Sequence, residues 1–417
     1  MITTYPPLGS SSTTALSVQL PSTSSDAFGR LRISQPMTLF DSSHRYSDNG
    51  LWSTATTGTA SATFVANEGL VNLSVGTANG DQLLRETTKV FPYQPGKSLL
   101  IMSTFIMAAA KTNLRQRVGY FGNDNGFYVE RENTSVYLVK RSLVTGSVTN
   151  TRVAQADWNQ DKLDGTGPSK LTINLDNAQI LYMDMEWLGL GTVRMGFIIN
   201  GVFVPAHSFH HSNLVTTTYI TTASLPLRYE ITNTGATAST SVLKQVCSTV
   251  ISEGGYELRG LQQAVGTPIT TSRSTLASGA FLPIVSLRLK STRLDAIIIL
   301  TAISIMGDGS TNNYNWQVHA NSVATGGTWT SAGANSSVEY NITGTGLTST
   351  GRVLASGFFA SSTQGSTNVD ILKESLFKFQ LERNYFTSSP YELTLVAAGA
   401  SSGQPVYGSM DWEEISR

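Results

Sequence analysis

Short runs of alternating apolar and polar residues, separated by turn signals, fill most of the chain between residues 51 and 254. Residues 70–75 and 98–107 show this period of two, which predicts strands with one buried face. Asn200-Gly201 stands between the apolar runs FII and VFV, and it predicts a two-residue hairpin because both positions accept a positive φ. Many short strands at this spacing predict a β-sandwich or jelly roll.

A second series of strand-like runs follows, including residues 284–290, 296–306 and 391–399. Glycine and asparagine separate these runs, as expected for turns. Helical periodicity is poor, and its best candidate is the short segment 368–379. The sequence therefore predicts an all-β protein with two β-sandwich or jelly-roll-like domains at residues 51–258 and 274–417, joined by a linker at residues 259–273.

Residues 1–50 predict an extended N-terminal arm that ends in a docking segment. The first 25 residues are rich in Ser, Thr and Pro, a composition that does not fold alone. They lack the basic and apolar regions of a signal peptide, and no apolar run in the chain has the length of a membrane span. We therefore expect a protein made in a cytoplasm that does not act in a membrane.

The composition favours contacts between protein subunits. Charged residues make up 13% of the chain, about half the usual share. Lys and Arg together number 28, as do Asp and Glu, so no basic excess is present to neutralise nucleic-acid phosphates. Hydroxyl and amide groups are cheaper to desolvate at an interface than ionised groups. The single cysteine, Cys247, excludes an intrachain disulfide.

Two groups of polar residues resemble reactive sites but favour structural roles. His207 and His211 would lie roughly 13 Å apart on an extended strand, too far to share one metal ion, with His210 on the other face. Asp184 and Glu186 share one strand face, whereas glycosidase carboxylates must flank a scissile bond at set separations. We therefore expect no catalytic residues, no metal site, no cofactor and no enzymatic activity.

Three short stretches imitate known motifs. Residues 399–403 match G-x-S-x-G without the helix that a nucleophile elbow requires. Gly96-Lys97-Ser98 imitates the end of a phosphate loop, but Phe91 replaces the first glycine. Residues 123–126 resemble a fragment of a calcium loop and predict a hairpin turn instead. We expect core packing for the tryptophans, with a sugar platform as the alternative, at Trp52, Trp158, Trp187, Trp316, Trp329 and Trp412.

Residues 26–41, DAFGRLRISQPMTLFD, resemble a motif of a family of virion structural proteins of tailed bacteriophages, including marine and cyanobacterial phages. The resemblance extends over about residues 26–400, through the stretches FPYQPGKSLLI, RQRVGYFGNDNGFYVE, DKLDGTGPSKLTINL, EWLGLGTVRMGFIING, LPLRYEITNTG and QVCSTVISEGGY. It implies a structural part of the virion, as a head decoration, a neck or tail appendage, or a short fibre. By analogy it also implies a concanavalin-like jelly roll for the first domain.

The motif also carries candidate docking residues. Arg30 and Arg32 alternate with Leu31 and Ile33, as on a short strand that could add to the sheet edge of a neighbouring subunit. The alternative is a first strand that packs within its own domain. The residues assigned to docking are Phe28, Arg30, Leu31, Arg32, Ile33 and Phe40. The expected partners are other virion proteins and further copies of the chain, with a trimer as the expected oligomer.

Two other functions remain open at this stage. The first is a receptor-binding protein that holds host glycans on a jelly-roll face, for which the sequence assigns no residues. The second is a depolymerase, which is disfavoured because a β-helix repeat is missing and the carboxylate pairing is weak.

Overall fold

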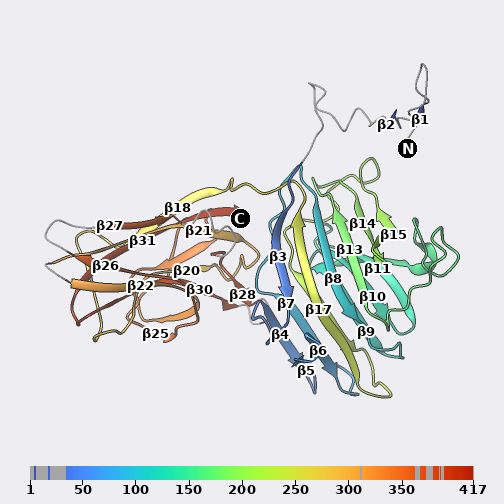
Figure 1. Ribbon diagram of the computed structural model, residues 1–417, viewed down its shortest axis with the longest axis horizontal. Coiled ribbons are helices and arrows are strands. Elements are labelled where there is room, and N and C mark those ends of the chain that lie inside the picture. Colours follow the sequence, from blue (N-terminus) through green and yellow to red (C-terminus); the bar gives the residue numbers. More distant parts are fainter. Residues whose placement is uncertain are drawn as a thin grey trace, which may run out of the picture.

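The computed structural model describes residues 34–309, 312–361, 367–371, 379–384, 386 and 389–416, together with the short strands β1 (Thr4–Tyr5) and β2 (Ser17–Val18). Two β-sandwiches lie side by side along the long axis (Figure 1). No α-helix occurs among the described residues, where helical structure is limited to short turns such as the 3-10 turn Gln155–Asp157. The predicted all-β class with two β-sandwiches is confirmed.

The first sandwich consists of two antiparallel sheets. The β17 sheet has the order β15-β14-β13-β8-β17-β6-β5, with β3 also paired to β17. Its strands are β3 (Met37–Ser43), β5 (Ser61–Val65), β6 (Leu70–Val75), β8 (Leu99–Ile106), β13 (Gln179–Met185), β14 (Val193–Ile199), β15 (Val202–Phe209) and β17 (Ser241–Ser252). The β16 sheet has the order β12-β11-β10-β9-β16-β7-β4. Its strands are β4 (Trp52–Thr57), β7 (Gln82–Thr87), β9 (Leu114–Phe121), β10 (Gly126–Glu132), β11 (Ser135–Ser142), β12 (Thr149–Ala154) and β16 (Leu227–Asn233).

The second sandwich also has two sheets. The β31 sheet has the order β18-β31-β21-β27, with β19 also paired to β31. Its strands are β18 (Leu261–Gly266), β19 (Arg273–Ser274), β21 (Ile297–Gly307), β27 (Thr367–Ile371) and β31 (Pro405–Ser416). The β22 sheet has the order β23-β24-β20-β30-β22-β25, with β26 also paired to β22. Its strands are β20 (Leu282–Leu289), β22 (Asn312–Thr325), β23 (Thr330–Ser331), β24 (Val338–Asn341), β25 (Gly346–Ser349), β26 (Arg352–Ser361) and β30 (Glu392–Gly399). A separate pair joins β28 (Arg383–Asn384) and β29 (Ser389–Pro390).

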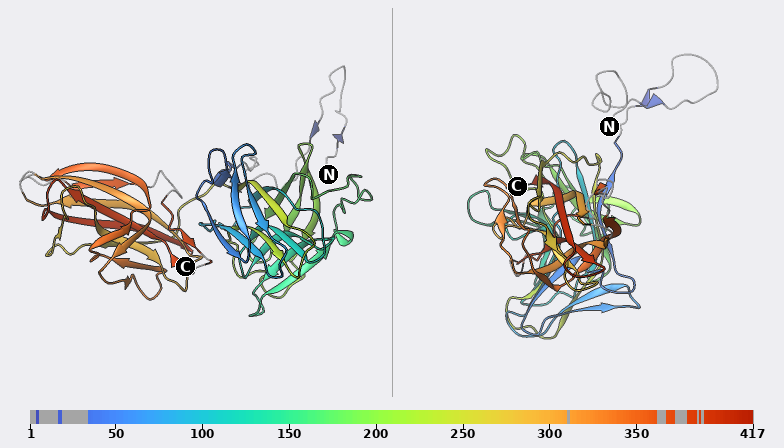
Figure 2. Two further views of the ribbon diagram at one scale, coloured as in Figure 1. Left: turned by 90° about the horizontal axis from the view of Figure 1, so that it is seen from below. Right: turned by 90° about the vertical axis from the view of Figure 1, so that its left-hand side faces the viewer.

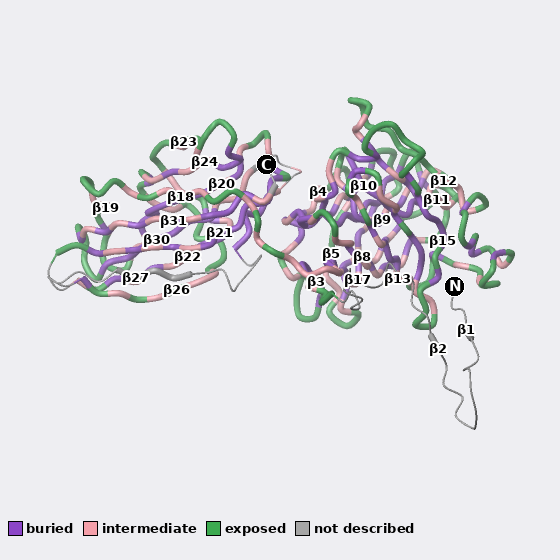
Figure 3. The backbone as a smooth tube through the Cα atoms, turned by 90° about the horizontal axis from the view of Figure 1, so that it is seen from above, coloured by how far each residue is buried: buried purple, intermediate pink, exposed green. Residues whose placement is uncertain are grey.

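The alternating pattern places one face of each central strand in a core. On β8, the apolar residues Leu99, Ile101 and Phe105 are buried together with Ser103, and the residues that alternate with these four are partly exposed. Each buried side chain of this size contributes about 1.5–3 kcal/mol through removal of apolar surface from water. Buried residues accordingly follow the strands, and exposed residues gather in the loops (Figure 3).

The predicted hairpin at Asn200-Gly201 is confirmed. It joins β14 to β15, with φ of 53° at Asn200 and 78° at Gly201. Two positive φ values in succession are what a type I′ turn requires, and this turn matches the twist of the paired strands.

The predicted domain boundaries need correction at the start of each sandwich. Met37–Ser43, expected in the arm, forms β3 and pairs with β17 from Ser252 to Cys247. Leu261–Gly266, expected in the linker, forms β18 and pairs with β31. The sequence did not reveal β18 because its residues are exposed or only partly buried, so backbone pairing and not an apolar face places it. The weak helical candidate at residues 368–379 overlaps β27, which spans Thr367–Ile371.

The two sandwiches lie next to each other (Figure 2), and they contact each other through apolar and polar groups. Ile297 and Ile299 of β21 belong to the apolar cluster of the first sandwich. Gln380 Nε2 donates a hydrogen bond to Val90 O over 2.8 Å, and the Arg383 backbone N–H donates to Thr88 O over 2.9 Å. The second sandwich therefore packs against the segment that follows β7.

Candidate functional site

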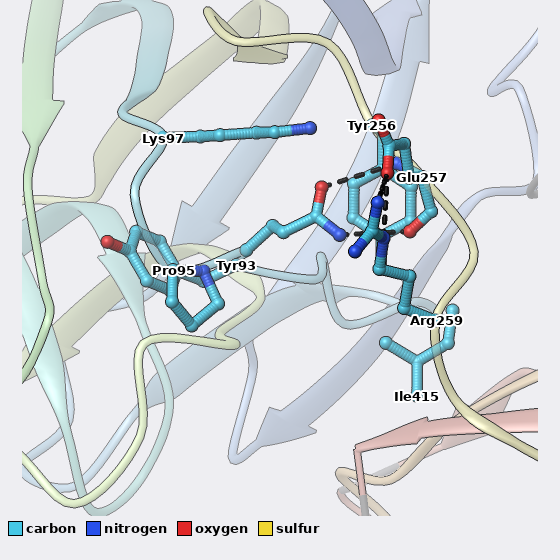
Figure 4. A pocket seen from close by; sticks show the side chains of 8 residues that line it. Tyr93, Pro95, Lys97, Tyr256, Glu257, Arg259 and Ile415 are labelled. Carbon is cyan, nitrogen blue, oxygen red and sulfur yellow. Dashed lines mark hydrogen bonds and ion pairs between the residues drawn. The ribbon is translucent and has the colours of Figure 1, made fainter.

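A pocket of about 450 Å³ opens where the two sandwiches meet (Figure 4). It lies between the segment that joins β7 to β8, the connection from β17 to β18, and the end of β31. Its lining residues are Tyr93, Gln94, Pro95, Lys97, Tyr256, Glu257, Arg259 and Ile415. Both sandwiches and their connection therefore build this junction pocket.

Reciprocal hydrogen bonds hold two of these segments together. Gln94 Nε2 donates to Glu257 O over 2.9 Å, and the Glu257 N–H donates to Gln94 Oε1 over 3.2 Å. The Lys97 N–H closes a turn on Gln94 O at 3.1 Å. Pro95 and Gly96, with φ of 85° at Gly96, occupy the central positions of this turn as in type II. The predicted imitation of a phosphate loop is therefore a β-turn.

The charged groups of the junction pocket are largely exposed. Arg259 contacts the Glu257 carboxylate at 2.5 Å, but their side chains are 75% and 59% exposed, so water and salt screen this pair. Burial and the nearby Glu413 raise the pKa of Tyr256, which stays protonated at neutral pH. The walls thus carry hydrogen-bond donors and acceptors and charged groups of both signs.

The N-terminal segment joins the body of the protein beside this pocket. Ser34 Oγ donates to Glu253 O over 2.6 Å, and Glu253 in turn accepts a hydrogen bond from Ser98 Oγ over 2.6 Å. Gly255 lies close to Gln35 O, which a Cβ on that glycine would approach to 3.3 Å. The predicted docking residues Phe28, Arg30, Leu31, Arg32 and Ile33 lie outside the described residues, directly before Ser34.

Phe40, the last predicted docking residue, lies in the core of its own domain. It is 7% exposed, and its ring contacts Phe91 and Trp52 with centroid separations of 4.8 and 6.1 Å. This position corresponds to the alternative of a strand that packs within its own domain. Phe40 therefore anchors β3, and its side chain is not available to a partner.

Buried ion pairs cross the junction between the sandwiches. Arg383 of β28 contacts Glu86 of β7 at 2.6 Å, and their side chains are 2% and 1% exposed. Arg228 of β16 approaches the same carboxylate at 3.3 Å, and Asp295 contacts the other side of Arg383 at 3.1 Å. Charges so deeply buried are stable only when paired, so Arg383 ties the second sandwich to the first.

The ion pairs continue across the outer face of the β16 sheet. Strand register places Arg117 of β9 between Glu230 and Glu130, and the contacts measure 3.2 and 2.5 Å. Arg228 connects this row to Glu86 through Glu230, at 3.3 Å from each carboxylate. The sequence shows charges two residues apart on these strands, but only the register reveals which of them face each other.

The histidine cluster serves the structure. His207 lies on β15, and its Nδ1 accepts a hydrogen bond from the Asn159 N–H over 3.2 Å. His211 follows that strand and stacks on Tyr219 with a centroid separation of 3.8 Å. Burial lowers the pKa of His207 and lowers that of His211 to about 4. No group of three or more His, Cys, Asp or Glu residues that could hold a metal ion occurs in the part of the chain that the structure describes.

The remaining candidates occupy sheet and loop positions. Asp184 on β13 pairs with Arg194 on β14, whereas Glu186 follows β13 and is exposed. Residues 399–403 form the loop from β30 to β31, and residues 123–126 form the turn from β9 to β10. Cys247 Sγ lies 3.4 Å from Thr104 Oγ1. Buried positions are confirmed for four tryptophans, Trp52, Trp158, Trp316 and Trp412, and Trp187 and Trp329 are partly buried.

No protein-family model and no curated protein sequence matches the chain. Solved structures with partial similarity include a protein of unknown function from Shewanella oneidensis, with 12% identity, coverage of 54% of this chain and 90% of that one, and a TM-score of 0.35. Peanut lectin shows 9% identity, 52% and 98% coverage, and a TM-score of 0.31. A carbohydrate esterase of the Shiga toxin-encoding bacteriophage phi24B shows 14% identity, 52% and 99% coverage, and a TM-score of 0.30. With scores below 0.5, none of these similarities bears on function.

Among the described residues, no helix is long and apolar enough to cross a membrane.

Proposed function

We propose that this chain is a non-enzymatic structural subunit of a tailed-bacteriophage particle, attached through the segment that precedes β3. The observation that carries the proposal is how that segment joins the body. Residues 26–41 resemble the virion motif, and their described part enters β3, which pairs with the internal strand β17. Phe40 secures β3 in the core. A partner that holds residues 26–33 would thereby hold the whole first sandwich.

The junction supports the same function. A particle component must keep its domains in fixed relative positions, and the buried Arg383–Glu86 pair joins the sandwiches here. The low charge content favours association with other virion proteins and with further copies of the chain, because fewer ions must be desolvated. A closed homo-oligomer, with a trimer as the proposed form, would satisfy every copy of such a surface.

Deletion of residues 1–33 tests the attachment. Because β3 begins at Met37, we expect the truncated chain to keep the circular dichroism spectrum of the full chain but to be missing from particles. Complementation of a phage that lacks the gene, followed by mass spectrometry of purified particles, measures incorporation. Incorporation of the truncated chain at the level of the full chain would disprove attachment through this segment.

A matched pair of variants separates the motif from general surface charge. Arg30→Ala combined with Arg32→Ala should reduce incorporation, whereas Arg194→Ala, which removes an arginine on β14 that is 60% exposed, should not. Equal losses in both variants would argue against a specific role of the motif.

A further inference from the structure

A second pocket, of about 420 Å³, lies at the end of the β22 sheet and has a different chemical character from the junction pocket. The side chains of Phe281, Asn315, Gln317 and Phe358 line it together with the 278–279 and 398–400 loops. None of the described residues that line it is Asp, Glu, Lys, Arg or His. A pocket of this size that is lined by aromatic residues and a few placed polar groups has the general form of a small-ligand site, and its described lining carries no charged side chain.

The polar side chains of this pocket are oriented by a chain of hydrogen bonds along the outer face of β22. His319 Nε2 lies 2.7 Å from Gln317 Oε1, and Gln317 Nε2 lies 3.4 Å from Asn315 Oδ1. Asn315 Nδ2 donates to Gly357 O over 2.9 Å. When Gln317 Oε1 accepts a hydrogen bond from His319, Gln317 Nε2 donates one of its two N–H groups to Asn315 Oδ1. The second N–H of Gln317 and a further lone pair on Asn315 Oδ1 then remain for a ligand.

Phe358 stands beside these amides with its ring in water. Strand register pairs Phe358 of β26 with Asn315 of β22, so both side chains lie on the same face. The side chain is 81% exposed, and a ligand that covers one face of the ring would remove apolar surface from water, which favours binding. The electron-rich ring face attracts the polarised C–H groups of a ligand.

We propose that this pocket binds a neutral saccharide ring. Phe358 stacks on the apolar face of the sugar, the Gln317 N–H donates to one hydroxyl, and Asn315 Oδ1 accepts from its neighbour. Adjacent sugar hydroxyls are both donors and acceptors, which fits an amide pair that offers one group of each kind. Since no lysine, arginine or histidine occurs among the described lining residues, the pocket favours a neutral sugar over a sialylated or sulfated one.

The full chain should be titrated calorimetrically with maltotetraose, chitotetraose and N-acetyllactosamine, and with sialylated and sulfated N-acetyllactosamine as anionic probes. We expect at least one neutral probe to bind and both anionic probes to bind more weakly. Phe358→Ala should weaken that binding about tenfold or more, and Phe358→Trp should preserve it. Gln317→Glu, which keeps an acceptor for His319 but removes the free N–H, should weaken it to a similar degree.

Phe203→Ala is the matched control, since Phe203 is a 50%-exposed phenylalanine on the first sandwich; it should leave binding unchanged. Binding of no neutral probe, unchanged affinity in Phe358→Ala, or tighter binding of the anionic probes would overturn the proposal. So would a Phe358→Ala variant that loses self-association by sedimentation and not sugar affinity, since the patch would then contact a second copy. Incorporation of the Phe358→Ala variant into particles tests the structural function separately.

Discussion

At the scale of single residues, burial decides the protonation of His211. The residue is 1% exposed, its Nδ1 lies 2.7 Å from Gly191 O, and its ring stacks on Tyr219. No carboxylate is among the contacts that set the pKa of His211, and the nearby Lys140 and His210 disfavour a positive charge on its ring. The folded protein therefore favours the neutral imidazole form of His211.

We expect acid to destabilise the protein partly through His211. Its folded-state pKa of about 4 lies below the ordinary histidine pKa of about 6.5, so its contribution is complete above pH 6.5 and is lost as the pH falls toward 4. In His211→Gln, the loss of unfolding free energy between pH 7 and 4.5 should shrink by about 2 kcal/mol. Urea denaturation at both pH values measures this, and exposed His210→Gln is the control. An unchanged pH dependence in His211→Gln would contradict this assignment.

At the scale of elements, the Asn200-Gly201 hairpin depends on backbone conformation alone. A Cβ at Gly201 would meet nothing within 4 Å, but φ is 78°. Gly201→Ala should therefore cost about 1 kcal/mol of unfolding free energy. Asn200→Gly, at the neighbouring position where φ is 53°, should change stability little. Thermal unfolding of both variants compares them, and equal losses would exclude a conformational origin.

Strand β3 belongs to the first sandwich as much as to the arm. Because its register with β17 covers Met37 to Ser43, deletion of residues 1–43 removes Leu39 and Phe40 from the core and frees a strand edge. We expect this deletion to lower the unfolding free energy by at least about 3 kcal/mol. Deletion of residues 1–33 should change it by less than about 0.5 kcal/mol. Chemical denaturation of the two truncated chains measures both unfolding free energies. Equal values would show that β3 does not contribute to stability.

At the scale of the whole molecule, the buried ion pair between Arg383 and Glu86 joins the two sandwiches. Arg383→Met removes the cation that contacts Glu86 and Asp295, and it leaves a buried carboxylate without this partner. We expect a loss of about 3–5 kcal/mol of unfolding free energy, together with looser docking of the sandwiches.

Small-angle scattering and limited proteolysis of Arg383→Met measure that docking. The control is Arg259→Ala at the exposed pair beside the junction pocket, where the loss should stay below about 1 kcal/mol. A compact Arg383→Met variant of wild-type stability would show that the apolar contacts of Ile297 and Ile299 suffice.

The sequence alone determined the strand-rich class, the two sandwiches and the hairpin at Asn200-Gly201. The alternation of apolar and polar residues and the residue types in the turns are local properties, so consecutive residues are enough to predict them. The resemblance of residues 26–41 to the virion motif is also a property of the sequence alone. Its docking residues before Ser34 lie outside the described residues, and their role stays a prediction.

Tertiary structure decided which distant residues meet. Arg383 and Glu86 are separated by 297 positions, and no local pattern marks them as partners. Strand β18 has only a weak apolar pattern, so consecutive residues did not predict it. Phe358 lies beside Gln317 only because of the register of β26 on β22. Pairing energy depends on the distance between groups in space, and that distance is fixed by the packing of sheets and not by order along the chain.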